Sequence, residues 1–154
     1  MPTLQWLEDF HRGDRWRSSA PIMVTRQAIL DFALHYDPQA MHLGAASVLA
    51  PDDQSDDLMI ASGWQTAAWT MRLLVDLGLD GPVGRHIDLD WPSPTCPGDA
   101  LSLELSVTAA RASRSTPGRG VVELDYLTRN QHGDIRQRTH AVVVAWARPD
   151  GLVA

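Results

Sequence analysis

The sequence predicts an α+β domain in which about five antiparallel strands form one sheet and a long helix lies on one side of it. The helix is indicated by apolar residues that recur at helical spacing between residues 62 and 77. The strands are indicated most clearly by residues 101–109, where apolar and polar side chains alternate at every position. Short connections join the last three predicted strands, and such connections require antiparallel pairing.

The first half of the chain predicts an extended segment at residues 15–24 and then a helix. Thr25 suits the N-cap of that helix, because its hydroxyl can accept a hydrogen bond from a free backbone N–H. Apolar residues then follow at helical spacing, namely Ile29, Phe32, Ala33 and Tyr36. Pro38 disfavours helical geometry at Asp37. The helix should therefore end where this carboxylate appears, which leaves the carboxylate outside the apolar stripe.

The long helix is predicted to begin near Ser62 and to end before Gly78, a residue type that favours the position after a helix. Arg72 and Asp76 are four residues apart and predict an ion pair on its surface. The predicted apolar face comprises Trp64, Ala67, Ala68, Met71, Leu74 and Val75. Small residues in the first half of the helix would allow a sheet to wrap closely around it.

Strands are predicted at residues 84–91, 101–109, 121–128 and 135–146. Turn-forming residues separate the last three, first at Pro117-Gly118 and then at residues 130–134. We expect these three strands to be neighbours in one sheet.

The composition predicts a single domain, residues 1–154, because this length can bury a core without disulfides or metal. Cys96 is the only cysteine, which excludes a disulfide or a thiolate metal site within one chain and fits a cytoplasmic protein. No signal peptide is expected, and no apolar run approaches the roughly 18 residues of a membrane span. The net charge of −6 argues against nucleic acid as a partner, since a nucleic-acid surface needs a clustered basic face.

The candidate site consists of Asp37, His42 and Gly63. An aspartate and a histidine around one water can exchange protons with it, because histidine titrates near neutrality and a carboxylate can orient water. Gly63 stands at the start of the long helix, where a backbone N–H can hold an oxyanion. Together these groups suit chemistry beside a carbonyl. On these residues alone a structural interpretation is favoured: an aspartate that ends a helix, a histidine with structural contacts and a glycine that permits close packing.

Three segments resemble the MaoC-like dehydratase family. Residues 32–42 read Phe-Ala-Leu-His-Tyr-Asp-Pro-Gln-Ala-Met-His, which resembles the family's Phe-Ala-x-x-x-Asp-Pro-Gln-Pro-x-His. Residues 61–64 read Ala-Ser-Gly-Trp, as in many members. Residues 89–101 resemble the family's Leu-Arg-Trp segment followed by Pro-x-x-Pro-Gly-Asp-x-Leu. The resemblance runs in order over residues 7–148.

This resemblance implies a hot-dog fold, in which a five-stranded antiparallel sheet wraps around a long central helix. It implies reversible hydration of a trans-2-enoyl thioester to a 3-hydroxyacyl thioester, carried by coenzyme A or an acyl carrier protein. Asp37 and His42 fall on the family's catalytic pair, and Gly63 on the residue whose N–H holds the thioester oxygen. The implied substrate-binding residues are Gln39, Ser62 and Trp64. No metal or other cofactor and no membrane partner is implied, and a homodimer is expected because a single unit leaves a strand edge open.

Two other functions remain open. Asp37 could activate water toward the carbonyl carbon, which would make the protein a thioesterase. Alternatively, the chain is a non-catalytic acyl-thioester-binding module or a partner subunit. Two departures from the family bear on this choice: Ala40 replaces a common proline, and the aspartate-rich residues 51–57 replace a Phe-Gly-Gly-like turn. Four aspartates near the site would oppose a polyanionic coenzyme A, so this segment is a solvated loop or a lid that narrows the substrate range.

Arginines cluster near the two predicted hairpin turns. One group comprises Arg111, Arg114 and Arg119, and the other comprises Arg136 and Arg138. Solvated hairpin ends are the favoured interpretation. The alternative is a local site for the phosphates of coenzyme A.

Overall fold

The computed structural model describes residues 4–44 and 59–149, so the aspartate-rich residues 51–57 lie outside the described residues. A short 3₁₀ turn (Leu7–Asp9) precedes the regular elements. These are β1 (Arg15–Arg17), β2 (Ile22–Met23), α1 (Arg26–Tyr36), α2 (Ala40–Leu43), α3 (Gly63–Leu77), β3 (Val83–Asp90), β4 (Ala100–Ala112), β5 (Arg119–Arg129) and β6 (Ile135–Trp146). All four strands predicted in the second half of the chain are present.

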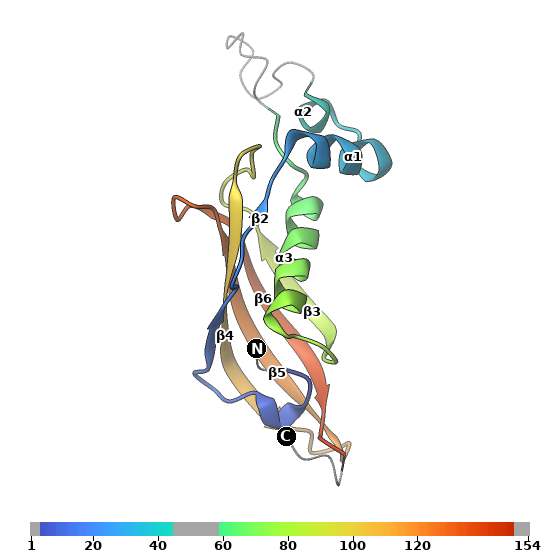
Figure 1. The fold of residues 1–154 in the computed structure, drawn as a ribbon. Helices are drawn as coiled ribbons and strands as arrows, with labels where there is room; N and C mark the ends of the chain where they lie inside the picture. The colour runs from blue at the N-terminus through green and yellow to red at the C-terminus, as the bar shows by residue number, and fades with distance from the viewer. Residues whose placement is uncertain (1–3, 45–58, 150–154) are drawn as a thin grey trace.

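One antiparallel sheet wraps around α3 (Figure 1). Its strand order is β1-β4-β5-β6-β3, and β2 also pairs with β4. The sheet therefore has six strands rather than the predicted five, because the N-terminal extended segment supplies two short strands instead of one. The chain leaves β4 after Arg17 and returns to it at Ile22, so β1 and β2 pair with different parts of the same neighbour.

The core lies between α3 and the inner face of the sheet. Alternate residues of the central strands point toward the helix and are buried, while their neighbours point away, as strand geometry requires. The buried apolar residues of these strands and of α3 include Leu101, Leu103, Leu105, Val107, Val122, Leu124, Tyr126, Ala141, Val143, Ala145, Leu73, Leu74 and Leu77.

The predicted apolar face of α3 is wrong in its orientation. Trp64, Met71 and Val75 are 64%, 49% and 51% exposed. The helix instead buries Gln65, Thr66, Thr70, Leu73 and Leu77, and of the predicted face it buries only Leu74. Burial of the two threonines is possible because their hydroxyls have partners: the Thr66 hydroxyl bonds the Thr95 hydroxyl at 2.9 Å, and the Thr70 and Thr128 hydroxyls are 2.7 Å apart.

Helix α1 begins and ends as predicted. The Thr25 hydroxyl accepts a hydrogen bond from the Ala28 N–H at 3.1 Å, and Asp37 is the C-cap residue. Ile29 and Ala33 are buried, whereas Tyr36 is 76% exposed, contrary to its place in the predicted stripe. In Figure 1, α1 and α2 lie near the N-terminal end of α3 rather than along the sheet.

Among the helices that the structure describes, none has the length and hydrophobicity that a membrane crossing would require.

Candidate active site

Asp37, His42 and Ser62 converge where the end of α1 meets the start of α3. His42 Nε2 lies 3.3 Å from Asp37 Oδ2, and the Ser62 hydroxyl donates a hydrogen bond to the same oxygen at 2.6 Å. The other carboxylate oxygen accepts a hydrogen bond from the Gln39 side-chain amide at 2.6 Å. Asp37 is thus held on both oxygens and also faces an imidazole.

The second nitrogen of His42 fixes the orientation of the ring. Nδ1 lies 2.8 Å from the backbone carbonyl of Ile60, which can only accept, so Nδ1 carries the proton. Nε2 is then the nitrogen without this proton, and it is the one that faces Asp37. The side chain of His42 is 5% exposed, so the pair lies in a largely enclosed position.

The hydrogen bonds to Asp37 hold the pKa of its carboxyl below the usual value. The bond from Ser62 is the largest cause, followed by the bond from Gln39; burial opposes them, and the charge of His42 adds to them. Asp37 is therefore a carboxylate at neutral pH. An anion at this point can orient a water molecule and stabilise a proton on His42 Nε2.

The short helix α2, which the sequence pattern did not predict, carries His42. It begins at Ala40, two residues after Pro38, and it ends at Gly44, whose positive φ of 72° is unfavourable for other residue types. The glycine two residues after His42 was the available signal for this turn. Because of α2, the chain reverses after Asp37 and brings the imidazole back over the carboxylate.

Gly63 is the first residue of α3, with its backbone N–H among those at the helix N-terminus that have no partner within the helix. A Cβ at this position would lie 2.8 Å from the Trp91 ring, so a larger residue does not fit beside it. Trp91 is held by a 3.0 Å hydrogen bond from its indole N–H to Gln137 Oε1. Trp64 stacks edge-on against Trp91, with ring centroids 5.5 Å apart. Neither Trp91 nor Gln137 is among the site residues predicted from the sequence.

Ser62 occupies the N-cap position of α3 without capping it. No helix N–H bonds its side chain, because the hydroxyl is directed at Asp37 instead. The predicted site residues Asp37, Gln39, His42, Ser62, Gly63 and Trp64 therefore lie at one junction between α1, α2 and α3.

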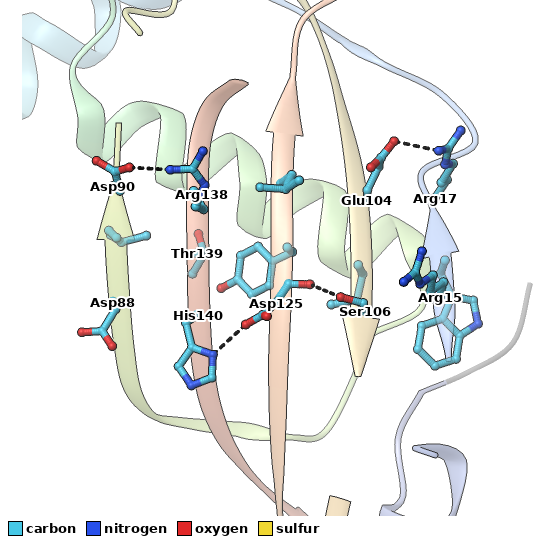
Figure 2. A pocket seen from close by; sticks show the side chains of 15 residues that line it. Arg15, Arg17, Asp88, Asp90, Glu104, Ser106, Asp125, Arg138, Thr139 and His140 are labelled. Atoms are coloured by element: carbon cyan, nitrogen blue, oxygen red, sulfur yellow. Dashed lines mark hydrogen bonds and ion pairs between the residues drawn. The ribbon is translucent and has the colours of Figure 1, made fainter. Parts of the chain in front are cut away.

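A groove of about 810 Å³ lies on the face of the sheet opposite α3 (Figure 2). None of the predicted site residues lines it. Charged side chains from neighbouring strands pair across it: Arg17 with Glu104 and Arg138 with Asp90, both at 2.9 Å. His140 Nδ1 lies 2.6 Å from Asp125 Oδ1 in the same groove. This hydrogen bond is the largest cause that raises the pKa of His140.

Arg136 is not available for a phosphate, contrary to one of the two interpretations of the hairpin arginines. Its side chain is 12% exposed and bonds both carboxylate oxygens of Asp99. Nor is it a solvated hairpin end, because it lies inside a polar network behind the connector between β3 and β4. Arg138 is exposed and paired with Asp90. Within residues 4–44 and 59–149, no three His, Cys, Asp or Glu side chains are grouped so as to hold a metal ion.

A sheet wrapped around a central helix is the architecture of a hot-dog protein, and here an Asp–His pair lies beside the start of that helix. Comparison with solved structures agrees. The chain is 42% identical to a MaoC-like dehydratase from Rhodospirillum rubrum, with 94% of this chain and 98% of that one covered and a TM-score of 0.82. The chain belongs to the MaoC-like dehydratase family.

More distant structures share the fold. An unliganded R-hydratase from Pseudomonas aeruginosa is 18% identical, with 96% of each chain covered and a TM-score of 0.67. A 3R-hydroxyacyl-ACP dehydratase complex from Mycobacterium tuberculosis is 16% identical, with 87% of this chain and 96% of that one covered and a TM-score of 0.59. No family model and no curated protein matches the sequence.

Proposed function

We propose that the protein catalyses reversible hydration of a trans-2-enoyl thioester to a 3-hydroxyacyl thioester. The observation that carries this proposal is the Asp37–His42 contact of 3.3 Å, held by Ser62 at the start of the helix that begins with Gly63. Membership of the MaoC-like dehydratase family supports the same class of reaction. In this proposal Asp37 and His42 are catalytic, and the Gly63 N–H binds the thioester oxygen.

The reaction needs one water molecule and two proton transfers. The water oxygen bonds to the β-carbon of the enoyl group, and its proton passes to the acid/base pair at His42 Nε2 or Asp37. The electrons of the double bond move toward the thioester carbonyl, whose oxygen gains negative charge. The N–H groups at the start of α3 stabilise that charge, because they are fixed before the reaction begins. The pair then returns a proton to the α-carbon, so the enzyme ends unchanged.

We propose different roles for the three remaining site residues. Gln39 and Ser62 act on the substrate through Asp37, since both side chains donate to its carboxylate. Trp64 is exposed on the first turn of α3 and is suited to cover the acyl thioester. Trp91 joins this group, because its ring lies against Gly63.

Crotonyl-coenzyme A tests the reaction. Hydration predicts loss of the enoyl absorbance without release of free thiol. Release of thiol with the acyl group intact would instead indicate the alternative function, thioester hydrolysis. Stabilisation of the protein by the thioester without turnover would indicate a non-catalytic binding module or partner subunit.

We propose an acyl thioester as the substrate, with either coenzyme A or an acyl carrier protein as its carrier. One structural neighbour is a 3R-hydroxyacyl-ACP dehydratase complex, which supports an acyl carrier protein as a candidate carrier. Parallel assays with the coenzyme A and carrier-protein thioesters of one acyl group separate the two. Faster turnover of one carrier at equal concentration identifies it.

We propose that two copies join through strand β3, which is the edge of the sheet. Its first half carries Arg85 and His86, and its second half carries Asp88 and Asp90. Antiparallel pairing of two β3 strands therefore places basic residues opposite acidic ones. Exposed apolar residues on β3 and directly after it are Val83, Ile87 and Trp91, and α3 also exposes Trp64, Met71 and Val75. We further propose that the whole chain is one domain and acts in the cytoplasm.

A further inference from the structure

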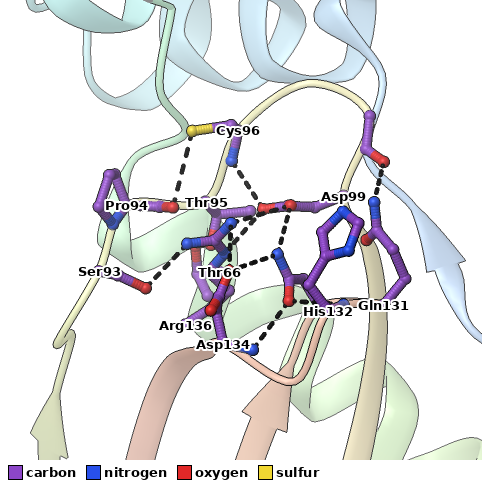
Figure 3. A network of polar contacts seen from close by, with 12 residues as sticks. Thr66, Ser93, Pro94, Thr95, Cys96, Asp99, Gln131, His132, Asp134 and Arg136 are labelled. Atoms are coloured by element: carbon purple, nitrogen blue, oxygen red, sulfur yellow. Dashed lines mark hydrogen bonds and ion pairs between the residues drawn. The ribbon is translucent and has the colours of Figure 1, made fainter.

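Asp99 and Arg136 form a buried ion pair beneath the connector between β3 and β4 (Figure 3). Arg136 Nε donates to Asp99 Oδ2 at 2.9 Å, and Arg136 Nη2 donates to Asp99 Oδ1 at 3.0 Å. The Cys96 N–H and the Asn130 side-chain amide donate to the same carboxylate at 2.9 and 3.1 Å. Burial opposes the ionisation of Asp99, but these hydrogen bonds outweigh it and hold its pKa below the usual value.

The pair fixes the connector at several points along its length. Besides binding Asp99, Arg136 donates from Nη1 to the Ser93 hydroxyl at 2.8 Å. The Ser93 hydroxyl in turn donates to the Ile135 carbonyl at 2.7 Å. Residues 93, 96 and 99 are thus all tied to one guanidinium on β6, either directly or through the carboxylate of Asp99.

The connector also holds the segment that leads into α3. The Thr95 carbonyl accepts a hydrogen bond from the Ala61 N–H at 2.8 Å. The Thr95 hydroxyl accepts one from the Thr66 hydroxyl, in the first turn of α3, at 2.9 Å. Ala61 precedes Gly63 by two residues, so the position of Thr95 sets the position of the helix start.

The same connector holds the segment that leads into α1. The Val24 N–H donates to the Asp99 carbonyl at 2.8 Å, and the Gly98 N–H donates to the Val24 carbonyl at 2.9 Å. Val24 is followed by the N-cap of α1, and Asp37 stands at the other end of that helix. The connector therefore holds both the segment that leads into α1, which ends at Asp37, and the segment that leads to Gly63.

We propose that Asp99 and Arg136 are positioning residues that align the Asp37–His42 pair with the Gly63 N–H. This inference rests on the proposed hydration. Neither residue contacts the site, and both act through the backbone of the connector. An arginine suits this role because its planar guanidinium binds both carboxylate oxygens and Ser93 at once, which a lysine ammonium cannot reproduce in the same geometry. Misplacement of a reacting group by about 1 Å lowers a rate by about 10²-fold.

The test compares Arg136→Met with a matched control, Arg138→Met. Arg138 lies two residues away on β6 and also binds a carboxylate, but it is exposed and does not bond the connector. We expect Arg136→Met to lower kcat for crotonyl-coenzyme A by about 10²-fold with little change in KM, because alignment rather than binding is lost. Arg138→Met should keep wild-type kcat. Arg136→Lys should recover part of the loss.

A purely structural role predicts a different result. In that case Arg136→Met lowers the folded fraction but leaves kcat per folded molecule unchanged. The folded fraction is measured by circular dichroism, and the assays are run at a temperature where each variant is folded. If Arg136→Met does not fold, Arg136→Lys carries the test. Wild-type kcat in the folded variant overturns the proposal.

Hydrogen exchange at the Ala61 and Val24 amides tests whether the connector is held in place, and it needs no activity assay. We expect both amides to exchange faster in Arg136→Lys than in Arg138→Lys, because their carbonyl partners lie on the connector. Unchanged exchange at these amides overturns the positioning role even if the enzyme is active. If the wild-type protein hydrates no enoyl thioester, the proposed function is wrong. The exchange result still tests whether Arg136 holds the connector in place.

Discussion

The hydroxyl of Ser62 donates a hydrogen bond of 2.6 Å to Asp37 Oδ2, which joins the N-cap of α3 to the C-cap of α1. Twenty-five residues separate the two side chains in the sequence. The contact removes Ser62 from the capping role that its position suggests and leaves the first N–H groups of α3 without a side-chain partner. It also holds the carboxylate beside the start of the helix, where a thioester oxygen would bind.

Substitution of either member of the acid/base pair should abolish most of the turnover. We expect Asp37→Asn and His42→Ala each to lower kcat by about 10²–10⁴-fold, the range for a lost acid/base group. The double variant should be scarcely slower than either single one, because the two groups act as one unit. Hydration of crotonyl-coenzyme A measures both effects. His35→Ala, at an exposed histidine of α1, serves as the control, and wild-type turnover in His42→Ala would contradict the assignment.

Removal of the Ser62 hydroxyl should shift the pH dependence of activity. The bond from Ser62 is the largest cause of the lowered pKa of Asp37, so Ser62→Ala should raise this pKa toward its usual value. Activity that requires the carboxylate is lost as the pH falls through the pKa of Asp37. The acidic limb of the kcat/KM profile should therefore move to higher pH in Ser62→Ala. Ser106→Ala, on the opposite face of the sheet, should leave it in place; an unmoved limb in Ser62→Ala would show that Asp37 does not need to be ionised.

Alanine at position 63 should strain the contact with Trp91. The added Cβ would lie 2.8 Å from the ring, and the ring can retreat only by weakening its bond to Gln137. We expect Gly63→Ala to destabilise the protein by about 1–3 kcal/mol, as overpacking usually does. Trp91→Leu in the same chain should restore part of this loss, as read from thermal unfolding. Gly84→Ala is the control, because its Cβ would meet only Ile87 at 3.9 Å; equal losses for both glycines would rule out the steric explanation.

A charged residue introduced on strand β3 should dissociate the proposed dimer. Sedimentation at micromolar concentration should give twice the chain mass of 17.0 kDa for the wild type. Ile87→Glu should give single chains, because Ile87 is exposed on the edge strand β3. Leu34→Glu, at a residue of α1 that is 60% exposed, should leave the dimer intact. Single chains for the wild type would exclude this interface.

Loss of the Asp99 charge should destabilise the protein at neutral pH but less so in acid. Asp99→Asn leaves Arg136 buried without its counter-charge, which costs about 3–5 kcal/mol. The pKa of Asp99 is lowered in the folded protein, so its stabilisation is complete above the pKa of the unfolded chain and is lost as the pH falls through the folded pKa. The difference in unfolding free energy between wild type and variant should stay constant from pH 7 to about pH 5 and shrink below about pH 4. Denaturant titrations across this range measure it, and a difference that stays constant to low pH would contradict the role of the charge.

Features that depend on a few neighbouring residues could be predicted from the chain alone. Thr25 caps α1, Gly78 ends α3, and the alternation at residues 101–109 forms most of β4, because capping and side-chain periodicity are local. The separation of Asp37 from the apolar stripe of α1 was also local, since Pro38 prevents the helix from continuing. The catalytic roles of Asp37, His42 and Gly63 came from the family resemblance rather than from their spacing, and they stay predictions.

Contacts between distant parts of the chain determine which face of α3 is buried and which residues complete the site. Thr66 and Thr70 are polar, yet they face the sheet because Thr95 and Thr128 satisfy their hydroxyls from distant parts of the chain. Trp64 is apolar, yet it is exposed beside the edge strand. The Trp91 ring lies against Gly63, and a hydrogen bond to Gln137, 46 residues further along the chain, holds the ring there. Such contacts have no periodic signature in the sequence, because they depend on where separate elements meet and on which polar groups find partners there.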